Sequence, residues 1–226
     1  MRARRIGYQT KCASNMQQLA NAFNAYAQDW DDRWPAPGGL AGDLSYWSQS
    51  SPKGGLNPYI KNHGNRSVFC CPLMPDWKSN YPARSYSMNS YLREPADVEY
   101  YSCTSIRSGI RVPNISRSND TILLFEGLPL TIGWEDLGYY VYIYRCCNWT
   151  GVKGYYSECK YTIDPAHPWH GKFNNYLYCD GHVEARAPGK YYPPGVSTHK
   201  EMYEWYVDKA KFERNWAKGY YRAPYE

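Results

Sequence analysis

The chain has 226 residues, a length that suits one large domain or two small ones. Charged residues make up 21% of the sequence, so a disordered chain is not expected. The net charge is +5 and the basic residues are scattered along the chain, which argues against a nucleic-acid-binding protein. No run of 18 apolar residues occurs, so the sequence as given contains no transmembrane helix.

Tyrosine dominates the aromatic residues, with 25 Tyr and 9 Trp against 5 Phe. Tyr and Trp combine an apolar ring with a polar group, so they tolerate half-hydrated positions and interfaces. We therefore expect aromatic contact surfaces on this protein.

A long helix is predicted over residues 3–31. Apolar side chains recur there at alternating steps of three and four, which is typical of a helix with one narrow apolar face. The pattern ends before Pro35, because proline disfavours the helical conformation in the residue that precedes it. We call this face the apolar seam. We expect it to pack on a sheet and to mediate assembly through Ile6, Ala13, Met16, Ala20, Phe23 and Ala27.

The beginning of this helix carries the wrong charge for a helix N-terminus. Arg2, Arg4, Arg5 and Lys11 lie in its first turns, and no Ser, Thr or Asp precedes them. Cations oppose the helix dipole at this end. We expect the run to be the middle of a longer helix whose upstream part precedes this sequence, with a frayed basic terminus as the alternative.

Eight cysteines bear on the redox state, at positions 12, 70, 71, 103, 146, 147, 159 and 179. No C-x-x-C occurs, so the patterns of zinc ribbons and thioredoxin-type sites are missing. An even number of scattered cysteines favours disulfides in an oxidising compartment, with buried free thiols as the alternative. Sequence alone cannot choose the pairing, and one candidate is Cys147 with Cys159, which would close a short loop.

The remaining elements follow in chain order. Residues 36–66 are rich in Gly, Pro and Ser and predict a long loop with a short helical turn. Residues 122–125 form the most apolar run and predict a central strand, and residues 139–146 are aromatic and β-prone. Beyond a Pro/Gly linker at 187–198, residues 200–218 predict a second helix. We divide the chain into an N-terminal helix at 1–35, an α+β head at 36–186 and a C-terminal extension at 187–226.

A β-hairpin is predicted around Asp180 and Gly181. Residues 174–179 and 182–186 alternate as strands, and Asp-Gly is a preferred two-residue type I′ loop. His170 is then expected to hydrogen-bond the hairpin or a neighbouring loop. This structural role accounts for His170, Asp180 and Gly181 without any reaction.

A metal site is the competing interpretation of the same segment. In a two-residue hairpin Cys179 faces His182, and His167 and His170 lie in the approaching loop. One cysteine and three histidines would suit zinc or copper. Their spacing matches no known pattern, however, and a disulfide at Cys179 would remove the site.

Several segments resemble the type IV pilin-like proteins, and most closely the large pseudopilin-like group with a C-terminal His-X9-Asp-Gly motif. Residues 12–35 are similar to the helix that follows the membrane segment in that group. Further similarities occur in the same order along the chain. They are Val68–Pro72 to an F-x-C-P segment, Ser85–Asn89 to S-Y-x-x-N, Ser118–Glu126 to an apolar strand ending in glutamate, and His170 through Gly181 to the name-giving motif.

The resemblance implies an α+β, pilin-like fold, with a long N-terminal helix packed on an antiparallel sheet, long loops and, here, an extra C-terminal helix. Members of the family carry an apolar N-terminal segment that anchors the subunit in the membrane and forms the filament core. This sequence lacks that segment, and we expect membrane contact only through it.

Two further expectations come from the resemblance. It places a cysteine in the segments that contain Cys12 and Cys71, which implies a disulfide between them. Some major pseudopilins bind calcium, and the acidic loop Asp29–Asp32 offers oxygen ligands. We therefore expect no cofactor, with calcium as a candidate ion at this loop.

Three classes of function compete. The seam and the resemblance favour a structural subunit, a pilin or pseudopilin, of an extracellular or cell-surface filament built from copies of this chain. The alternative is an extracellular module that binds glycans or a surface through a Tyr/Trp face. No phosphate-binding loop, nucleophile elbow or H-E-x-x-H motif supports the third class, a secreted hydrolase. We therefore expect no catalytic residues and no enzyme activity.

Overall fold

The computed structural model describes residues 2–37, 47, 55–61, 67–73, 85–89, 91–92, 94, 109–126, 140–141, 170–187 and 203–218. Their longest element is helix α1, Arg2–Asp29. The predicted bounds of 3–31 are therefore correct to within two residues. At about 1.5 Å of rise per residue, α1 is a rod of about 42 Å.

The C-terminal end of α1 is closed by two aspartates in the left-handed conformation. Asp31 and Asp32 have φ values of 55° and 56°. The amide of Asp32 donates to the carbonyl of Ala27 at 3.0 Å, which satisfies one of the last helical carbonyls. Aspartate tolerates this backbone better than most residues, and Pro35 prevents the helix from resuming.

A five-stranded sheet follows the helix, in the spatial order β3-β1-β2-β4-β5. Its four longer strands pair antiparallel, while the two-residue β3 pairs parallel with β1 at one edge. The predicted strands at 122–125, 174–179 and 182–186 are confirmed, whereas β1 was not predicted as a strand. The bounds are β1 Tyr86–Asn89, β2 Ile122–Glu126, β3 Tyr140–Val141, β4 Asn174–Tyr178 and β5 Val183–Arg186.

The hairpin between β4 and β5 has a longer loop than predicted. Tyr178 pairs with His182, because the amide of Tyr178 donates to the carbonyl of His182 at 2.9 Å. Only Gly181 in the loop has a positive φ, 94°, and its amide donates to Tyr178 at 3.0 Å. The predicted two-residue type I′ turn is therefore wrong, and the loop is the three-residue kind that ends in a left-handed glycine.

Asp180 nevertheless has a structural role in this loop, as predicted. Its Oδ1 accepts a hydrogen bond from the amide of His182 at 3.1 Å and lies 2.6 Å from Nδ1 of the same histidine. The aspartate therefore holds the turn closed.

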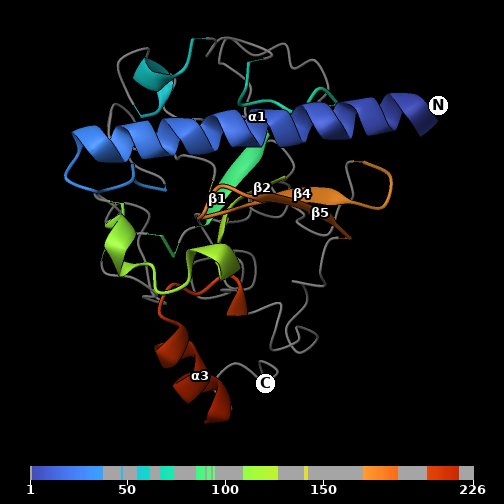
Figure 1. Ribbon diagram of the computed structural model, residues 1–226. Coiled ribbons are helices and arrows are strands. Elements are labelled where there is room, and N and C mark those ends of the chain that lie inside the picture. Colours follow the sequence, from blue (N-terminus) through green and yellow to red (C-terminus); the bar gives the residue numbers. More distant parts are fainter. Residues whose placement is uncertain are drawn as a thin grey trace, which may run out of the picture.

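The sheet lies between α1 and the C-terminal segment. α1 crosses one face and packs mainly on β4, with further contacts to β5 (Figure 1). On the other side Trp205 packs edge-to-face on Phe125, with ring centroids 5.0 Å apart. The side-chain amide of Asn89 donates to the Trp205 carbonyl at 2.8 Å, which fixes this segment against the sheet.

The predicted C-terminal helix is shorter than residues 200–218. Helix α3 spans Lys209–Ala217, because Asp208 caps its N-terminus by accepting a hydrogen bond from the amide of Lys211 at 2.8 Å. Residues 205–207 precede the cap and are buried. Among the described residues there are also three 3-10 helices: η1 Asn57–Tyr59, η3 Val112–Asn114 and η4 Ser118–Asp120.

One hydrophobic core joins all three segments that the sequence suggested, since it extends from Cys12 on α1 to Phe212 on α3. The fold is thus α+β, with one long helix on an antiparallel four-stranded arrangement and a short parallel edge strand. None of the helices in the described ranges combines the length and hydrophobicity needed to cross a bilayer.

Burial corrects part of the assembly prediction. Met16, Ala20, Phe23 and Ala27 lie in the chain's own core, so they cannot meet a second subunit. Ala13 is half-buried, and Ile6 is 54% exposed. The apolar seam is therefore an internal contact along most of its length and an open one only at its N-terminal end.

Candidate functional site

Four side chains from distant parts of the chain meet under α1. Cys12 comes from α1, Cys71 from the turn at 67–73, Glu126 from the end of β2, and His170 from the loop before β4. One sulfur, oxygen or nitrogen atom from each lies within 4.8 Å of the others, and all four residues are buried. We call these residues the Cys-Cys-Glu-His cluster.

Glu126 is held by the neighbouring strand. Its Oε2 accepts the backbone amide of Asn175 at 2.7 Å, and its Oε1 accepts the side-chain amide of Asn175 at 3.3 Å. The Asn175 side chain also donates to the carbonyl of Gln9 at 3.2 Å. Asn175 therefore links β4, the carboxylate and α1 at one point.

One ring nitrogen of His170 contacts both a carboxylate and a thiol. Its Nε2 lies 2.8 Å from Oε1 of Glu126 and 3.7 Å from Sγ of Cys71. The loop that aims the ring is tight: the amide of His170 donates to Phe173 at 3.1 Å, and Gly171 has a φ of 87°. A glycine is favoured there because a side chain at that φ would be strained.

The ring contacts argue against a nucleophile–base–carboxylate relay. In such a relay the carboxylate holds one ring nitrogen and the nucleophile contacts the other. Here Glu126 and Cys71 share Nε2, and Nδ1 has no hydrogen-bond partner among the residues described. The two acids are placed around a common centre rather than in line.

Cys71 sits in a turn that positions its sulfur. Its amide hydrogen-bonds Oγ of Ser85, and the amide of Leu73, two residues later, hydrogen-bonds its sulfur. Asn15 on α1 donates to the carbonyl of Cys70 at 3.0 Å, which fixes the turn against the helix. The turn and the helix therefore bring Cys71 and Cys12 together.

Cys12 lies between Cys71 and Tyr86, and its sulfur hydrogen-bonds both side chains. Tyr86 is the strand partner of Glu126, so it lies on the same side of the sheet. The hydroxyl of Tyr86 also accepts the side-chain amide of Asn15 at 3.4 Å. The wall of the site is thus built from β1, β2 and α1.

The electrostatics of the cluster distinguish its two sulfurs. Burial raises the pKa of Cys12, and the neighbouring Cys71 and Glu126 raise it further. The hydrogen bond with Cys12, assisted by those from His170 and Leu73, lowers the pKa of Cys71 to about 7. Burial lowers the pKa of His170, but its contacts with Cys71 and Glu126 outweigh that effect and raise it to about 9. Cys71 is thus the more easily ionised thiol.

The structure does not assemble the metal site that the sequence suggested. Of the candidates that the structure describes, which are His170, Cys179 and His182, only His170 belongs to the Cys-Cys-Glu-His cluster. Cys179 is buried in the hairpin loop, where its amide bonds Thr121, and His182 stacks on Tyr178. The prediction failed because Cys179 does not face His182 in the observed register. His167 lies outside the described residues.

The prediction that His170 hydrogen-bonds the hairpin or a neighbouring loop is confirmed for the loop, since its ring contacts Cys71 in the turn at 67–73 as well as Glu126 at the end of β2.

The predicted Cys12–Cys71 disulfide is not formed, although the two residues are neighbours. Both are free thiols here, as are Cys70 and Cys179. The expectation that most cysteines are paired therefore finds no bond among these four. The second candidate pair, Cys147 with Cys159, lies outside the described residues.

The acidic loop that suggested calcium uses its carboxylates elsewhere. Asp29 accepts the Tyr59 hydroxyl at 2.9 Å, and Asp31 pairs with Arg111. In the part of the chain that the structure describes, only the Cys-Cys-Glu-His cluster gathers three or more metal-ligand side chains. The loop is therefore a poor calcium site.

Glu126 is the member of the cluster that the sequence analysis named neither as a metal ligand, like His170, nor as a disulfide candidate, like Cys12 and Cys71. The sequence did contain a sign of its role, because Glu126 directly follows the apolar run Ile-Leu-Leu-Phe. All five residues of this strand, Glu126 included, are buried. A carboxylate in a buried strand needs a partner, since an isolated buried charge is costly.

Comparisons with known protein families, with curated proteins and with solved structures each found no match.

Proposed function

We propose that this protein is a non-enzymatic subunit of an extracellular or cell-surface filament, with a pilin-like fold, built from copies of the same chain. The supporting observation is the N-terminal part of α1. Side chains at residues 3–7 are exposed, including Ile6 at 54%, while Met16 and Phe23 on the same helix are fully buried. In the part of the chain that the structure describes, the apolar side chain at this end of the helix is therefore largely uncovered.

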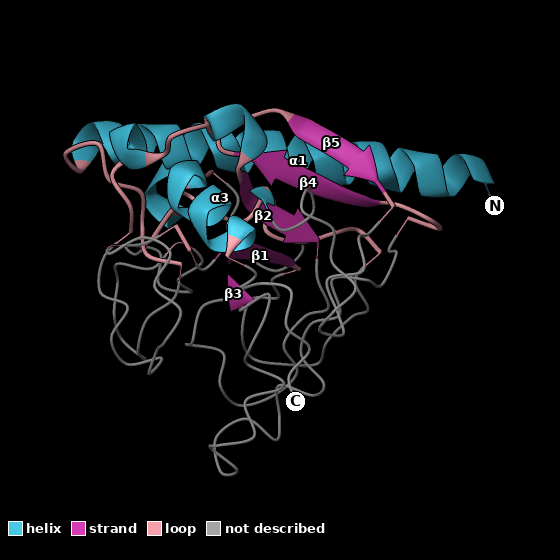
Figure 2. Cartoon of the chain, turned by 90° about the horizontal axis from the view of Figure 1, so that it is seen from below, coloured by secondary structure: helices cyan, strands magenta, loops and turns pink. Residues whose placement is uncertain are grey.

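The geometry of the helix supports this proposal. α1 continues past the ends of the strands, so its first turns project from the body in both views (Figures 1 and 2). A helix of 28 residues is longer than is needed to cover the face of this sheet. The projecting turns continue the helical rod toward a neighbour.

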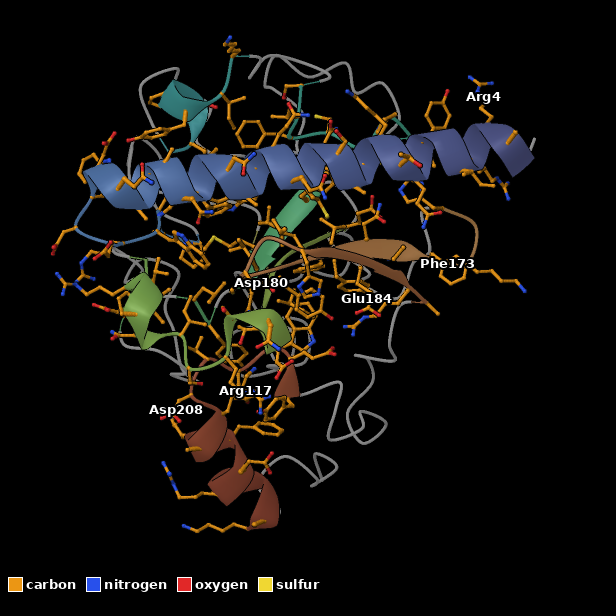
Figure 3. The ribbon with its side chains drawn as sticks, viewed as in Figure 1. Arg4, Arg117, Phe173, Asp180, Glu184 and Asp208 are labelled. Carbon is orange, nitrogen blue, oxygen red and sulfur yellow. The ribbon has the colours of Figure 1, made fainter. Side chains whose placement is uncertain are left out.

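A second apolar side chain lies at the same end of the molecule. Phe173, in the loop before β4, is 43% exposed, and Figure 3 shows it below the N-terminal end of α1, where Arg4 is labelled. Ile6 and Phe173 are two of the three large apolar side chains that are exposed in the described ranges. The third, Trp30, stacks on Tyr26 and hydrogen-bonds Tyr59, so it is already engaged.

A second copy of the chain is the occupant that we assign to this end. Ile6 is in phase with the apolar seam, so a neighbour's helix could continue the packing that Met16 and Phe23 make internally. Contact between one end of a rod and a different surface of the next copy is heterologous, and such contacts produce filaments when the rotation does not close. Tyr-rich surfaces suit lateral contacts, since a tyrosine has few torsions to order.

Self-association of the purified chain tests the proposal. We expect concentration-dependent oligomers by sedimentation velocity and elongated particles by electron microscopy. The double change Ile6→Asp and Phe173→Asp should leave the chain monomeric with an unchanged circular dichroism spectrum. The control is Ala217→Asp, which adds one negative charge at an exposed position on α3 and should assemble like the unaltered chain.

Two results would contradict the filament proposal. One is assembly that persists in the double variant, which would place the contact elsewhere. The other is a chain that stays monomeric at all concentrations but binds oligosaccharides on a glycan array, which would favour the alternative of an aromatic binding module.

A further inference from the structure

We propose that Cys12, Cys71, Glu126 and His170 bind one zinc ion as a tetrahedral structural site. The spacing of the four donor atoms carries the proposal. A tetrahedral zinc ion, with bonds of about 2.3 Å to sulfur and about 2.0 Å to nitrogen or oxygen, holds its ligand atoms roughly 3.3–3.8 Å apart. Sγ of Cys71 and Nε2 of His170 are 3.7 Å apart, and all four donors lie within 4.8 Å. Nε2 of His170 and Oε1 of Glu126 share a hydrogen bond at 2.8 Å, and a zinc ion would replace that bond and separate the two atoms to about 3.3 Å.

The chemistry of the donors selects zinc. Two cysteine sulfurs with one imidazole make a soft, tetrahedral set, and calcium and magnesium prefer oxygen-only sites. The carboxylate of Glu126 completes four ligands without a water. Because all four positions come from the protein and both Glu126 and His170 side chains are 0% exposed, the site has no open position for a substrate.

Partners outside the cluster already orient three of its four donors. The amide of Leu73 bonds the Cys71 sulfur, Tyr86 bonds the Cys12 sulfur, and Asn175 bonds both oxygens of Glu126. Such outer partners fix the geometry of ligands in metal sites. The donors are therefore presented by a built framework rather than gathered by chance on a surface.

The balance of charge also favours a bound cation. The cluster brings three acidic groups into one buried place with a single imidazole. The contacts that the structure gives for these four residues include no Lys or Arg side chain, within the described part of the chain. A divalent ion would let both thiols ionise without leaving buried negative charge uncompensated.

A zinc ion here would connect four segments that are far apart in the sequence, at positions 12, 71, 126 and 170. It would hold α1 against the end of β2, the turn at 67–73 and the loop before β4. This role does not depend on filament assembly, because the site lies inside a single chain.

A Cys12–Cys71 disulfide is the competing state of the same residues. It needs the two sulfurs at about 2.05 Å and would remove both from coordination. Metal binding and the disulfide therefore exclude each other. Zinc uptake by the reduced chain distinguishes the two states.

The test uses the full chain, reduced and stripped of metal with a chelator under anaerobic conditions. We expect it to take up one Zn²⁺ per chain and to unfold at a higher temperature when zinc is added. X-ray absorption should show two sulfur ligands at about 2.3 Å and two lighter ligands at about 2.0 Å. Cobalt in place of zinc should give a tetrahedral visible spectrum and thiolate-to-metal charge-transfer absorption.

Matched variants assign the ligands. Cys71→Ser and His170→Gln should each weaken zinc binding by more than about a hundredfold, beyond the loss typical of outer partners. Cys70→Ser and His182→Gln change the same residue types outside the cluster and should bind like the unaltered chain.

The proposal is overturned if the reduced chain takes up no zinc, or if Cys71→Ser and Cys70→Ser bind equally well. Should the ligand variants fail to fold, the cobalt spectrum of the unaltered chain decides, and absence of thiolate charge transfer would reject the site.

Discussion

The two halves of α1 differ in surroundings although one apolar pattern runs through both. From Cys12 to Ala27 the seam is covered by the sheet and by aromatic loops, and Phe23 contacts the rings of Trp34 and Trp47 at 5.5 and 6.1 Å. From residue 3 to residue 7 the helix is exposed, and Arg4 hydrogen-bonds Tyr8 within the helix at 2.9 Å. The same periodicity can therefore serve the core at one end and leave an open surface at the other.

The Cys-Cys-Glu-His cluster lies at the boundary between the two halves. Cys12 begins the buried half, and the carbonyl of Gln9, one turn earlier, accepts the side-chain amide of Asn175. The sheet thus stops supporting the helix close to the cluster. A metal at that point would strengthen the last contact before the projecting turns.

The largest expected difference between the halves is in core packing. Phe23→Ala should lower the free energy of unfolding by about 3–5 kcal/mol, because it leaves a cavity between two tryptophans. Urea unfolding of the full chain measures the change. Ile6→Ala is the control and should stay within about 0.5 kcal/mol, as is usual for a surface position. Equal losses in the two variants would mean that the N-terminal turns are packed as tightly as the rest.

Much of this comparison could be predicted from sequence, and some of it could not. Periodicity is a local property, so the helix and the strands at 122–125 and 174–186 were found. β1 was missed because its four residues, Tyr86–Asn89, are held by long-range contacts, notably Asn89 with Ile122 and Trp205. The burial of each seam residue could not be predicted either, because the apolar pattern does not say which of these residues the sheet covers.

The candidate site illustrates the same limit. Cys12, Cys71 and His170 each drew notice, but for separate reasons, and Glu126 was passed over as a ligand. Their meeting depends on the pairing of Tyr86 with Glu126 and on the rotation of α1 above the sheet, which no spacing in the chain encodes. The predicted set around Cys179 failed for a similar reason, because one added loop residue changed the register of the hairpin.

A smaller effect tests whether the projecting turns are a stable helix. Gly7→Ala should raise the free energy of unfolding by about 0.5–1 kcal/mol, because alanine is the better helix former and its Cβ would meet nothing within 4 Å. Thermal and urea unfolding measure the gain. Gly171→Ala is the contrasting change, and it should destabilise because alanine would be strained at a φ of 87°. No gain at Gly7 would indicate that these turns are frayed in the single chain.

The smallest effect concerns the other end of α1, where Arg33 is tied to the body by Glu94 at 2.6 Å. Partial burial raises the pKa of Glu94, but donors from Arg33, the amide of Arg111 and Asn114 outweigh it and hold the pKa below its ordinary 4.5. A carboxylate with a lowered pKa stabilises the fold above its unfolded pKa and loses that contribution as the pH falls through the folded value.

Glu94→Gln should therefore cost less than about 1 kcal/mol at neutral pH, since the pair is partly exposed and screened by solvent. The difference from the unaltered chain should vanish at about pH 3 and shrink in high salt. Urea unfolding of both proteins across this range measures it. A difference that grows toward low pH would reverse the sign of the argument and show that Glu94 is not held as a carboxylate in the folded chain.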